Sequence, residues 1–369
     1  MKQRLCASRA LPPAVVKGSK KMENCEKVAG FEMNLAEWRA FVQEKLGLQR
    51  YVADQICQWV YQKKTFDFEQ MTNLSKSLRA SLPDQIDLTL PRMERRQVSA
   101  DGTRKYLWRL SDGEFIESVI LDHGNHYTAC ISSQVGCPLR CEFCATGRQG
   151  FTRNLTAGEI VSHFTAMEAD LGRDINNVVF MGMGEPLLNY DNVIKAVRML
   201  MEPKMRGMGV RRITISTSGI ADGIRRLADE GLDIYLCLSL HAPNDEIRSR
   251  LMPVNNRYPL GTVLSALEYW QKKSGVRLTI EYVLLKNIND TPECAYEMVT
   301  LFENLQVYVN LIPYNPVAGT RFARPSASRI KPFMDILKEL GVEAELRREK
   351  GTDIDAACGQ LRGKAQERQ

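Results

Sequence analysis

Three cysteines stand close together near the middle of the chain, between Gly136 and Gly147. Cys137, Cys141 and Cys144 follow CxxxCxxC spacing, with an aromatic residue just before the last cysteine. One short loop with this spacing can present three thiolates to one face of a four-iron cluster, which leaves the fourth iron without a protein ligand. Because a cluster that only carries electrons is normally closed by four cysteines, the pattern predicts chemistry at the open iron.

A zinc knuckle or a group of buried structural cysteines is the alternative interpretation of this loop. Structural zinc sites take four ligands and usually pair CxxC with a second cysteine pair far along the chain. The sequence has no such second pair. The spacing therefore favours an iron-sulfur cluster with three cysteine ligands.

The composition indicates a folded protein of a reducing compartment. The 369 residues are 44% hydrophobic, enough for two or three domains with a sizeable core. Ten cysteines are spread along the chain, which fits a reducing compartment better than a disulfide framework. The sequence contains no run of about 18 apolar residues, so it predicts no membrane-spanning helix. We therefore expect a cytoplasmic protein that makes no membrane contact.

The charge balance is basic. Lys and Arg number 50 against 44 Asp and Glu, a formal net charge of +6, which favours a polyanionic partner without requiring one. The chain begins with a basic stretch that has no acidic residue before Glu23 and carries Pro12 and Pro13 within its apolar part. This composition argues against a secretory signal and predicts a disordered leader over residues 1–30.

Two parts are predicted between this leader and the cysteine loop. Apolar residues such as Leu35, Trp38 and Phe41 recur at helical spacing, which predicts a small helical domain over residues 31–88. Alternating segments separated by Asp-Gly turn signals then predict a β meander over residues 89–126.

Strands and helices alternate through residues 127–340. Six strands are predicted, at Tyr127–Ser133, Val178–Met181, Ile213–Ser216, Ile234–Leu240, Leu278–Leu284 and Val307–Ile312. A helical pattern follows each strand, which indicates βα units and a parallel sheet. Six units are too few for a closed eight-stranded barrel, so we expect an α/β fold with a partial (β/α)6 barrel, followed by a C-terminal segment over residues 341–369. The site of such a barrel lies at the carboxyl ends of its strands.

Small polar and acidic residues follow several of these predicted strands. Gly184 would let the backbone approach a ligand, and Glu185 could accept a hydrogen bond from an ammonium group. The other candidates at strand ends are Ser216, Ser239, Leu240, His241 and Asn315. Such a collection suits a polar nucleoside ligand, although a lone histidine is more often structural than a ligand.

The motifs resemble a known family. The cysteine loop is similar to that of the radical S-adenosylmethionine (SAM) superfamily. Together with the other segments it resembles the dual-specificity RNA adenine carbon-2 methyltransferases, which act on 23S rRNA and tRNA. The resemblance extends over about residues 33–362 and is carried by the segments Gly136–Gly147, Met181–Leu188, Ser239–Ala242, Asn310–Pro316 and Gly351–Leu361.

This resemblance implies the cofactors and partners. It implies one [4Fe-4S] cluster held by the three cysteines, with SAM bound to the fourth iron. The substrates would be 23S rRNA and tRNA, the electron donor a reductant such as flavodoxin or ferredoxin, and the protein a monomer. Carbon 2 of adenine is an electron-poor ring carbon that cannot attack a sulfonium methyl group directly. The family therefore methylates a cysteine sulfur with one SAM and makes that methyl group a radical with a second.

The resemblance also assigns three catalytic residues. Cys358 would carry the methyl group, Cys130 would release the product by forming a disulfide with it, and Glu117 would accept the proton of the ring carbon. By residue type alone, Cys358 is one more carboxy-terminal cysteine, Cys130 a strand-core thiol and Glu117 an exposed hairpin charge.

Basic residues near the proposed site and the helical domain could pair with RNA phosphates, which position a nucleic acid without reading its sequence. These residues are Arg92, Arg95, Arg96, Arg148, Arg153, Lys204, Arg206, Arg211, Arg212, Arg347 and Arg348.

Three other functions remain open from the sequence. The first is methylation of adenine at carbon 8, the activity associated with antibiotic resistance. The second is activation of a glycyl radical on a partner protein, which needs the cluster but neither Cys358 nor Cys130. The third is an RNA-binding scaffold with a structural metal.

Overall fold

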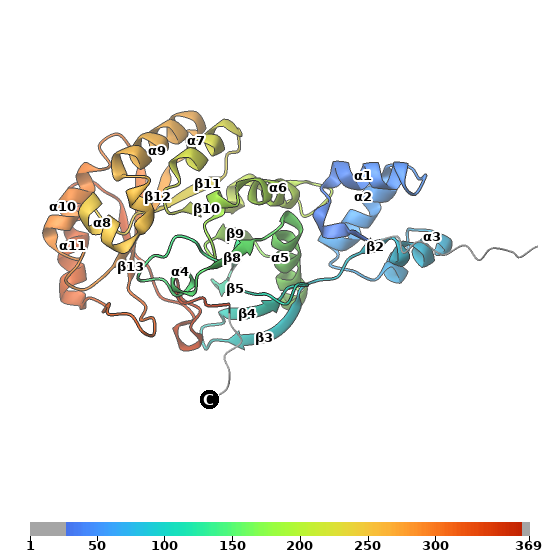
Figure 1. Ribbon diagram of the computed structural model, residues 1–369, viewed down its shortest axis with the longest axis horizontal. Coiled ribbons are helices and arrows are strands. Elements are labelled where there is room, and N and C mark those ends of the chain that lie inside the picture. The colour runs from blue at the N-terminus through green and yellow to red at the C-terminus, as the bar shows by residue number, and fades with distance from the viewer. Residues whose placement is uncertain (1–26, 364–369) are drawn as a thin grey trace, which may run out of the picture.

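The computed structural model describes residues 27–363. The predicted leader lies almost entirely outside this range, as do the last residues of the predicted C-terminal segment, 364–369. Figure 1 shows a small helical domain beside a larger α/β part.

The helical domain forms where apolar residues recur at helical spacing. Asn34 caps its first helix, because its side chain accepts from the amide of Glu37 (3.0 Å) while the Glu37 carboxylate accepts from the amide of Asn34 (2.7 Å), a reciprocal capping box. The elements are β1 (Val28–Ala29), α1 (Leu35–Glu44), α2 (Tyr51–Cys57), a π-helical turn (Gln58–Gln62), α3 (Lys76–Ser81) and β2 (Ile86–Asp87).

A ten-stranded sheet forms the centre of the α/β part, in the order β14-β13-β12-β11-β10-β9-β6-β5-β4-β3. Neighbours from β6 to β14 are parallel, and those from β3 to β6 are antiparallel. The predicted partial barrel with a linking meander is therefore confirmed. The strands are β3 (Arg92–Val98), β4 (Arg104–Arg109), β5 (Phe115–Asp122), β6 (Tyr127–Cys130), β9 (Asn177–Phe180), β10 (Ile213–Thr217), β11 (Tyr235–Ser239), β12 (Leu278–Leu284), β13 (Val307–Pro313) and β14 (Ala344–Leu346).

Three short strands differ from the prediction. The segment predicted as one strand, Tyr127–Ser133, ends at Cys130, and β7 (Gln134–Gly136) instead pairs with β8 (Phe151–Asn154) in a hairpin that frames the cysteine loop. β14 adds a seventh parallel strand beside β13. Its three residues are too few to produce a periodic signal.

Helices cover the outer face of the barrel strands (Figure 1). α5 begins at a second capping box, in which Thr156 and Glu159 exchange hydrogen bonds, and ends at the left-handed Gly172. Among the helices of residues 27–363, none is long and apolar enough to cross a membrane. They are α4 (Ala145–Gln149), α5 (Ala157–Leu171), α6 (Tyr190–Met201), α7 (Ala221–Asp229), α8 (Asp245–Leu251), α9 (Leu260–Ser274), α10 (Pro292–Thr300) and α11 (Ala327–Glu339).

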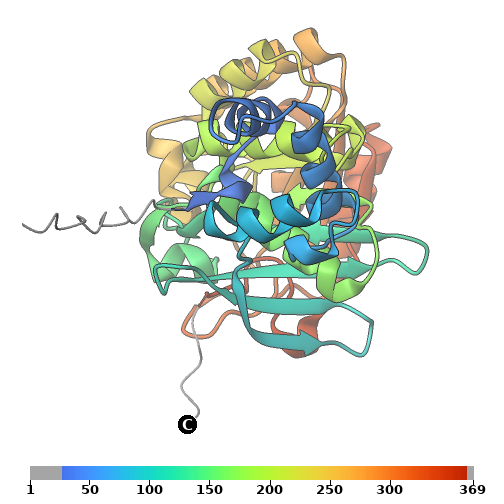
Figure 2. The same ribbon diagram turned by 90° about the vertical axis from the view of Figure 1, so that its right-hand side faces the viewer.

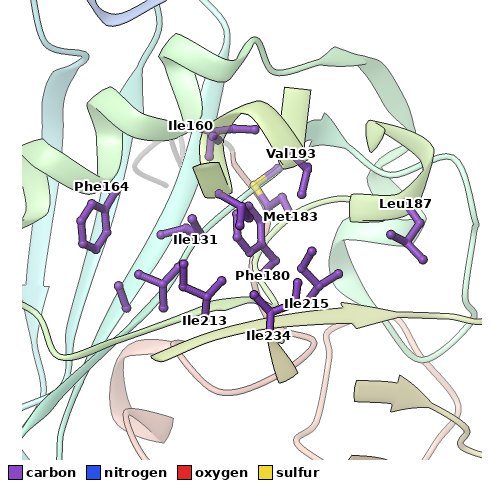
Figure 3. Packing of buried hydrophobic residues seen from close by; sticks show 14 of the residues in the cluster. Ile131, Ile160, Phe164, Phe180, Met183, Leu187, Val193, Ile213, Ile215 and Ile234 are labelled. Atoms are coloured by element: carbon purple, nitrogen blue, oxygen red, sulfur yellow. The ribbon is translucent and has the colours of Figure 1, made fainter. Parts of the chain in front are cut away.

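The core lies between these helices and the sheet. Figure 3 shows Ile160 of α5 and Val193 of α6 above Phe180 of β9 and Ile213 of β10. All four side chains are fully or almost fully buried. Burial of this apolar layer fixes the strands whose carboxyl ends form the site.

The helical domain packs against α5 and α6, as the side view of Figure 2 also shows. The Glu32 carboxylate accepts from the amide of Gly158 (3.1 Å), at the first turn of α5, where the helix dipole favours an anion. On α6, Lys195 pairs with Glu37 (2.8 Å). These contacts attach the domain directly to the barrel.

His163 of α5 makes folding stability depend on pH. Its ring is fully buried, its Nδ1 contacts the Glu159 carbonyl (2.7 Å), and its Nε2 has no partner among the described residues. Burial lowers the pKa of His163 to about 4, whereas an unfolded histidine titrates near 6.5. The unfolded state therefore binds the extra proton below pH 6.5, and stability falls as the pH drops toward 4.

Between pH 7.5 and pH 5, we expect the free energy of unfolding of His163→Met to fall by about 2 kcal/mol less than that of the wild type. Urea unfolding of both proteins at the two pH values measures this difference. Parallel stability curves for the two proteins would contradict the assignment.

Candidate active site

The cysteine loop follows β7 and is closed by a tight backbone contact. The amide of Cys137 donates to the carbonyl of Gly150 (2.7 Å). Gly136 has φ 76°, and a Cβ there would lie 2.0 Å from the same carbonyl oxygen. Only glycine fits this position, so the β7–β8 hairpin brings the two ends of the loop together and turns the cysteines inward.

A cavity at the carboxyl ends of the barrel strands, the central cavity, collects most of the predicted site residues. These are Cys137, Cys141, Cys144, Gly184, Glu185, Ser216, Ser239, His241, Asn315 and Cys358. Three predicted residues do not line this cavity: Leu240, Cys130 and Glu117. The side chain of Leu240 is fully buried, and its carbonyl accepts from Arg248 Nε (3.1 Å).

Burial raises the pKa of all three cluster cysteines, that of Cys137 to about 12. The thiols of Cys137 and Cys144 raise the pKa of Cys141 further. Three neighbouring desolvated thiols are a poor arrangement for a structural core but a good one for a metal cluster, which binds cysteines as thiolates. The arrangement therefore fits a cluster.

No group of three or more His, Cys, Asp or Glu side chains within residues 27–363 converges on a point suited to a single metal ion. A four-iron cluster is larger than one ion, and each cysteine binds a different iron atom. The three cysteines line one cavity, which is the arrangement that such a cluster requires.

Glu185 is held by the backbone rather than free in the cavity. Its Oε2 accepts from the amide of Ser218 (2.7 Å), and its Oε1 accepts from the amide of Leu187 (3.1 Å). Burial raises the pKa of Glu185, and these amide hydrogen bonds oppose that rise. The carboxylate therefore joins the ends of β9 and β10, and it can accept a ligand ammonium only with its remaining lone pairs.

His241 has a structural role visible in its contacts. Its Nδ1 accepts from the amide of Val283 (3.1 Å), its ring meets Phe143 edge-on at 5.1 Å, and its backbone is left-handed (φ 58°). Burial lowers the pKa of His241 to about 3, so the ring is neutral at pH 7. A neutral ring that lines the cavity can donate from Nε2 to a ligand.

Arg248 of α8 is a buried residue that the sequence did not indicate. Its guanidinium donates to the carbonyls of Ser218 (2.7 Å) and Leu240 (3.1 Å) and to Asn255 Oδ1 (2.9 Å). Burial lowers the pKa of Arg248 to about 10. The hydrogen bonds of this guanidinium hold the loops after β10 and β11 in place. In the sequence, only the apolar residues Ile247 and Leu251 indicate that Arg248 is buried, because they place it on the buried side of a helix.

The segment that carries Cys358 is tied to α4 by two hydrogen bonds just after this cysteine. The carbonyl of Gly359 accepts from the amide of Ala145 (2.8 Å), and that of Leu361 accepts from Thr146 Oγ1 (2.7 Å). Cys358 itself is exposed to the cavity space and is a free thiol. The segment therefore holds this thiol beside the cysteine loop, because Ala145 directly follows Cys144.

Cys130 lies at the end of β6 and lines a second cavity, which Cys358 also lines. It is a free thiol. Burial raises the pKa of Cys130 to about 12, with a further contribution from Cys358 and an opposing one from Arg347. Cys130 and Cys358 thus line the same cavity, Cys130 from the sheet and Cys358 from the C-terminal segment.

Glu117 of β5 faces a neighbouring cavity that neither thiol lines. Its Oε1 pairs with Lys105 Nζ (3.0 Å), and its Oε2 accepts from the amide of Arg362 (2.7 Å). Lys105 also donates to the carbonyl of Asp355 (3.1 Å). Both charged side chains are about 8% exposed. This pair fastens the C-terminal segment to β4 and β5.

We expect Lys105→Met to lower the free energy of unfolding by about 3–5 kcal/mol, because it leaves the Glu117 carboxylate buried without its cation. Urea unfolding at pH 7.5 measures the change. Lys331→Met, which removes an exposed ion pair with Asp335, should leave the free energy of unfolding nearly unchanged. The double variant Lys105→Met/Glu117→Gln should recover part of the loss. An equal cost for the two single variants would contradict the buried pair.

Six of the basic residues considered for RNA binding pair with acidic residues of the protein: Arg92, Arg96, Arg153, Lys204, Arg206 and Arg347. Arg206 pairs with Glu168 (2.7 Å) with both side chains largely buried, Arg153 pairs with Glu159 (2.7 Å), and Arg96 pairs with Asp170 (2.7 Å). For Arg206 the expected phosphate contact is wrong, since its side chain is only 13% exposed.

Comparison with known proteins identifies the family. The Radical SAM superfamily matches residues 131–299, and the ribosomal RNA large subunit methyltransferase N-terminal domain matches residues 31–88. A probable dual-specificity RNA methyltransferase RlmN of Thermotoga maritima is 54% identical over 86% of this chain and 92% of its own length. A protein of the same description from Pseudothermotoga lettingae is 49% identical over 88% of this chain and 95% of its own length.

Among solved structures, a radical SAM methyltransferase from Sphaerobacter thermophilus superposes with a TM-score of 0.87 at 44% identity. The match covers 91% of this chain and 100% of that one. The two family domains, the sequence relatives and the solved structure from Sphaerobacter thermophilus all indicate the same family. The chain belongs to the RlmN family of radical SAM RNA methyltransferases.

Proposed function

We propose that the protein methylates carbon 2 of adenine in 23S rRNA and tRNA, with Cys358 as the methyl carrier. One observation carries this proposal: Cys358 lines the central cavity together with Cys137, Cys141 and Cys144. A radical enzyme without a methyl carrier has no use for an exposed thiol beside the cluster loop. The RlmN relatives are described as dual-specificity RNA methyltransferases, which supports both RNA classes as substrates.

The cavity residues would hold the cofactors as follows. The three cysteine sulfurs would bind three irons of a [4Fe-4S] cluster, and SAM would bind the fourth iron. A Cβ at Gly184 would lie 2.6 Å from Gln134, so glycine lets this backbone pack against β7 where it lines the cavity beside the methionine part. Ser216, Ser239 and Asn315 line the remainder of the cavity, where their polar atoms can bind the nucleoside part. SAM supplies a transferable methyl group and, after one-electron reduction, a carbon radical.

Cys358 performs the first step as a nucleophile. Its exposed thiol would release its proton to water, and its sulfur would take the methyl group from the sulfonium by displacement, so that the S-methyl thioether forms as the sulfonium carbon-sulfur bond breaks and S-adenosylhomocysteine leaves. The hydrogen bonds of Ala145 and Thr146 to the backbone around Cys358 hold this sulfur in position. Ordered placement of this kind lowers the barrier of a group transfer.

Cys130 performs the release. After the methyl carbon has bonded to the base, protein and RNA are joined through the Cys358 sulfur. The Cys130 thiolate attacks that sulfur and a disulfide forms, while the carbon-sulfur bond breaks with its electron pair on the carbon, which takes up a proton and becomes the methyl group. In this proposal Glu117 accepts the ring proton, which requires the end of the C-terminal segment to leave the contact between Arg362 and Glu117.

The setting follows from the same chemistry. An oxygen-sensitive cluster and a catalytic disulfide that must be reduced each turnover both need a reducing cytoplasm. We propose flavodoxin or ferredoxin as the electron donor, and a monomer as the active form.

Anaerobic turnover with 23S rRNA or tRNA, followed by mass spectrometry of the digested nucleosides, tests this function. We expect 2-methyladenosine and two SAM consumed per methyl group transferred. A product methylated at carbon 8 would overturn the proposed carbon-2 activity and support the carbon-8 alternative. Cleavage of SAM without any RNA product would instead favour a glycyl-radical activase, and zinc in the anaerobically purified protein would overturn the radical chemistry.

A further inference from the structure

A second cavity of about 600 Å³ extends from the cluster loop, where Cys144 and Thr146 line it, toward the starts of the barrel strands. Residues near the starts of the strands line it, including Thr128 of β6, Thr214 of β10 and Thr279 of β12. Pockets of several hundred Å³ commonly hold ligands the size of a nucleotide. This space, which we call the lower cavity, is therefore large enough for a flipped base and its sugar.

The lower cavity continues into the central cavity. Both are lined by Cys358, Thr146, Glu281 and Arg347, while Cys130 lines only the lower one. A substrate that occupies the lower cavity therefore reaches the Cys358 sulfur from the side of Cys130. SAM reaches the same sulfur from the side of the cluster cysteines.

The gap between the two edges of the open barrel forms the entrance. β5 and its turn line one side of the cavity, and the residues after β14 line the other. Lys350 crosses between the two sides, where its Nζ donates to the carbonyl of Asp122.

The rim of this entrance is basic. Arg347, Arg348 and Lys350 lie on it. Three acidic residues also line the cavity: Glu345 accepts from Tyr308, Glu349 pairs with Arg324 (2.5 Å), and Glu281 pairs with Arg347 (3.6 Å). Arg348 and Lys350 have no carboxylate partner among the described residues, so these two cations are available to a phosphate backbone.

Two histidines add a flat surface to the same rim. The rings of His123 and His126 are stacked, with centroids 4.5 Å apart and planes within 9°. Burial lowers the pKa of His123, and the charges of His126, Lys350 and Arg347 lower it further. A neutral imidazole is a stacking surface rather than a phosphate clamp, and unpaired RNA bases commonly stack on aromatic and histidine side chains.

We propose that the substrate RNA enters through the lower cavity, with the nucleotide next to the target adenine stacked on the His123–His126 pair and its phosphate on Arg348. This inference rests on the proposed function and adds the route and the contacts of the substrate. Because the target base would occupy the lower cavity, RNA can bind while SAM occupies the central cavity.

Affinity for RNA without turnover tests this route. The cluster-loaded protein is titrated anaerobically with a tRNA anticodon stem-loop that contains the target adenine. We expect His123→Ala/His126→Ala to weaken binding about tenfold. Arg348→Glu should weaken it by at least as much and reduce the slope of log affinity against log salt by about one. Lys272→Glu, the same charge change on an exposed residue of α9, should leave the affinity unchanged.

A measurement on the unmodified protein guards against misfolded variants. An RNA with 4-thiouridine beside the target adenine is crosslinked by light, and the attached peptides are identified by mass spectrometry. We expect crosslinks within residues 121–128 and 345–350. Unchanged affinity of both variants, or crosslinks confined to the cluster loop, would overturn the route. Failure of the wild-type protein to methylate RNA that it still binds would overturn the proposed function and not the route.

Discussion

Cys358→Ala should abolish RNA methylation, with a loss of more than about a thousandfold, because the variant has no sulfur to carry the methyl group. Its three cluster cysteines remain, and the backbone contacts of Gly359 and Leu361 do not involve the changed side chain. We therefore expect the iron content and the reductive cleavage of SAM to be kept. Iron analysis, release of 5'-deoxyadenosine and nucleoside mass spectrometry measure the three properties separately.

Cys294→Ala is the matched control for this experiment. Cys294 is a free, buried thiol on α10 that lines neither cavity, and its replacement should leave methylation near the wild-type level. If Cys358→Ala still methylated RNA, the methyl group would have to reach the base without a carrier. If the wild type made no methylated RNA but activated a partner protein, the activase alternative would hold.

The cluster loop was predictable because its information is local. Three cysteines within eight residues need only a tight loop to meet, and the glycine at position 136 makes that loop possible. The strand ends were predictable for a related reason, since parallel strands bring residues from distant segments to one edge of a sheet. Ser216 and Ser239 illustrate this, with hydroxyl oxygens 3.4 Å apart across β10 and β11.

The partners of the buried charges could not be predicted in the same way. Lys105 meets Asp355 across 250 positions of sequence, and Glu117 meets Arg362 across 245. No periodicity records such a contact, because it depends on how the C-terminal segment crosses the open edge of the barrel. The same holds for Arg248, whose partners come from three loops. The sequence and its family resemblance therefore predicted two thiols that line the cavities, but not the residues that hold them in place.

The predicted role of Glu117 shows the consequence of this limit. Family resemblance assigns it a proton transfer, whereas its contacts with Lys105 and Arg362 give it a structural role in the described conformation. The two roles are compatible if RNA binding displaces the end of the C-terminal segment, since Arg362 then releases one carboxylate oxygen. Entry through the lower cavity would bring the RNA against this same segment.

Cys130→Ala should trap the protein on its RNA. The variant keeps Cys358 and the cluster, so the methyl carbon still bonds to the base, but no free thiol remains in the lower cavity to attack the Cys358 sulfur, because Cys144, which also lines it, would bind the cluster. We expect a covalent protein–RNA species that survives denaturing gel electrophoresis and accumulates to about one equivalent per active site, with no multiple turnover. Mass spectrometry of the trapped peptide should locate the link at Cys358.

The control for this trap is Cys237→Ala. Cys237 of β11 is a fully buried barrel thiol that lines neither the central nor the lower cavity, so its loss should neither trap RNA nor stop turnover. The double variant Cys130→Ala/Cys358→Ala should form no adduct, because the link needs the Cys358 sulfur. An adduct in that double variant would place the covalent bond on another residue. Normal turnover by Cys130→Ala would mean that an external thiol reaches the Cys358 sulfur through the same opening that admits the RNA.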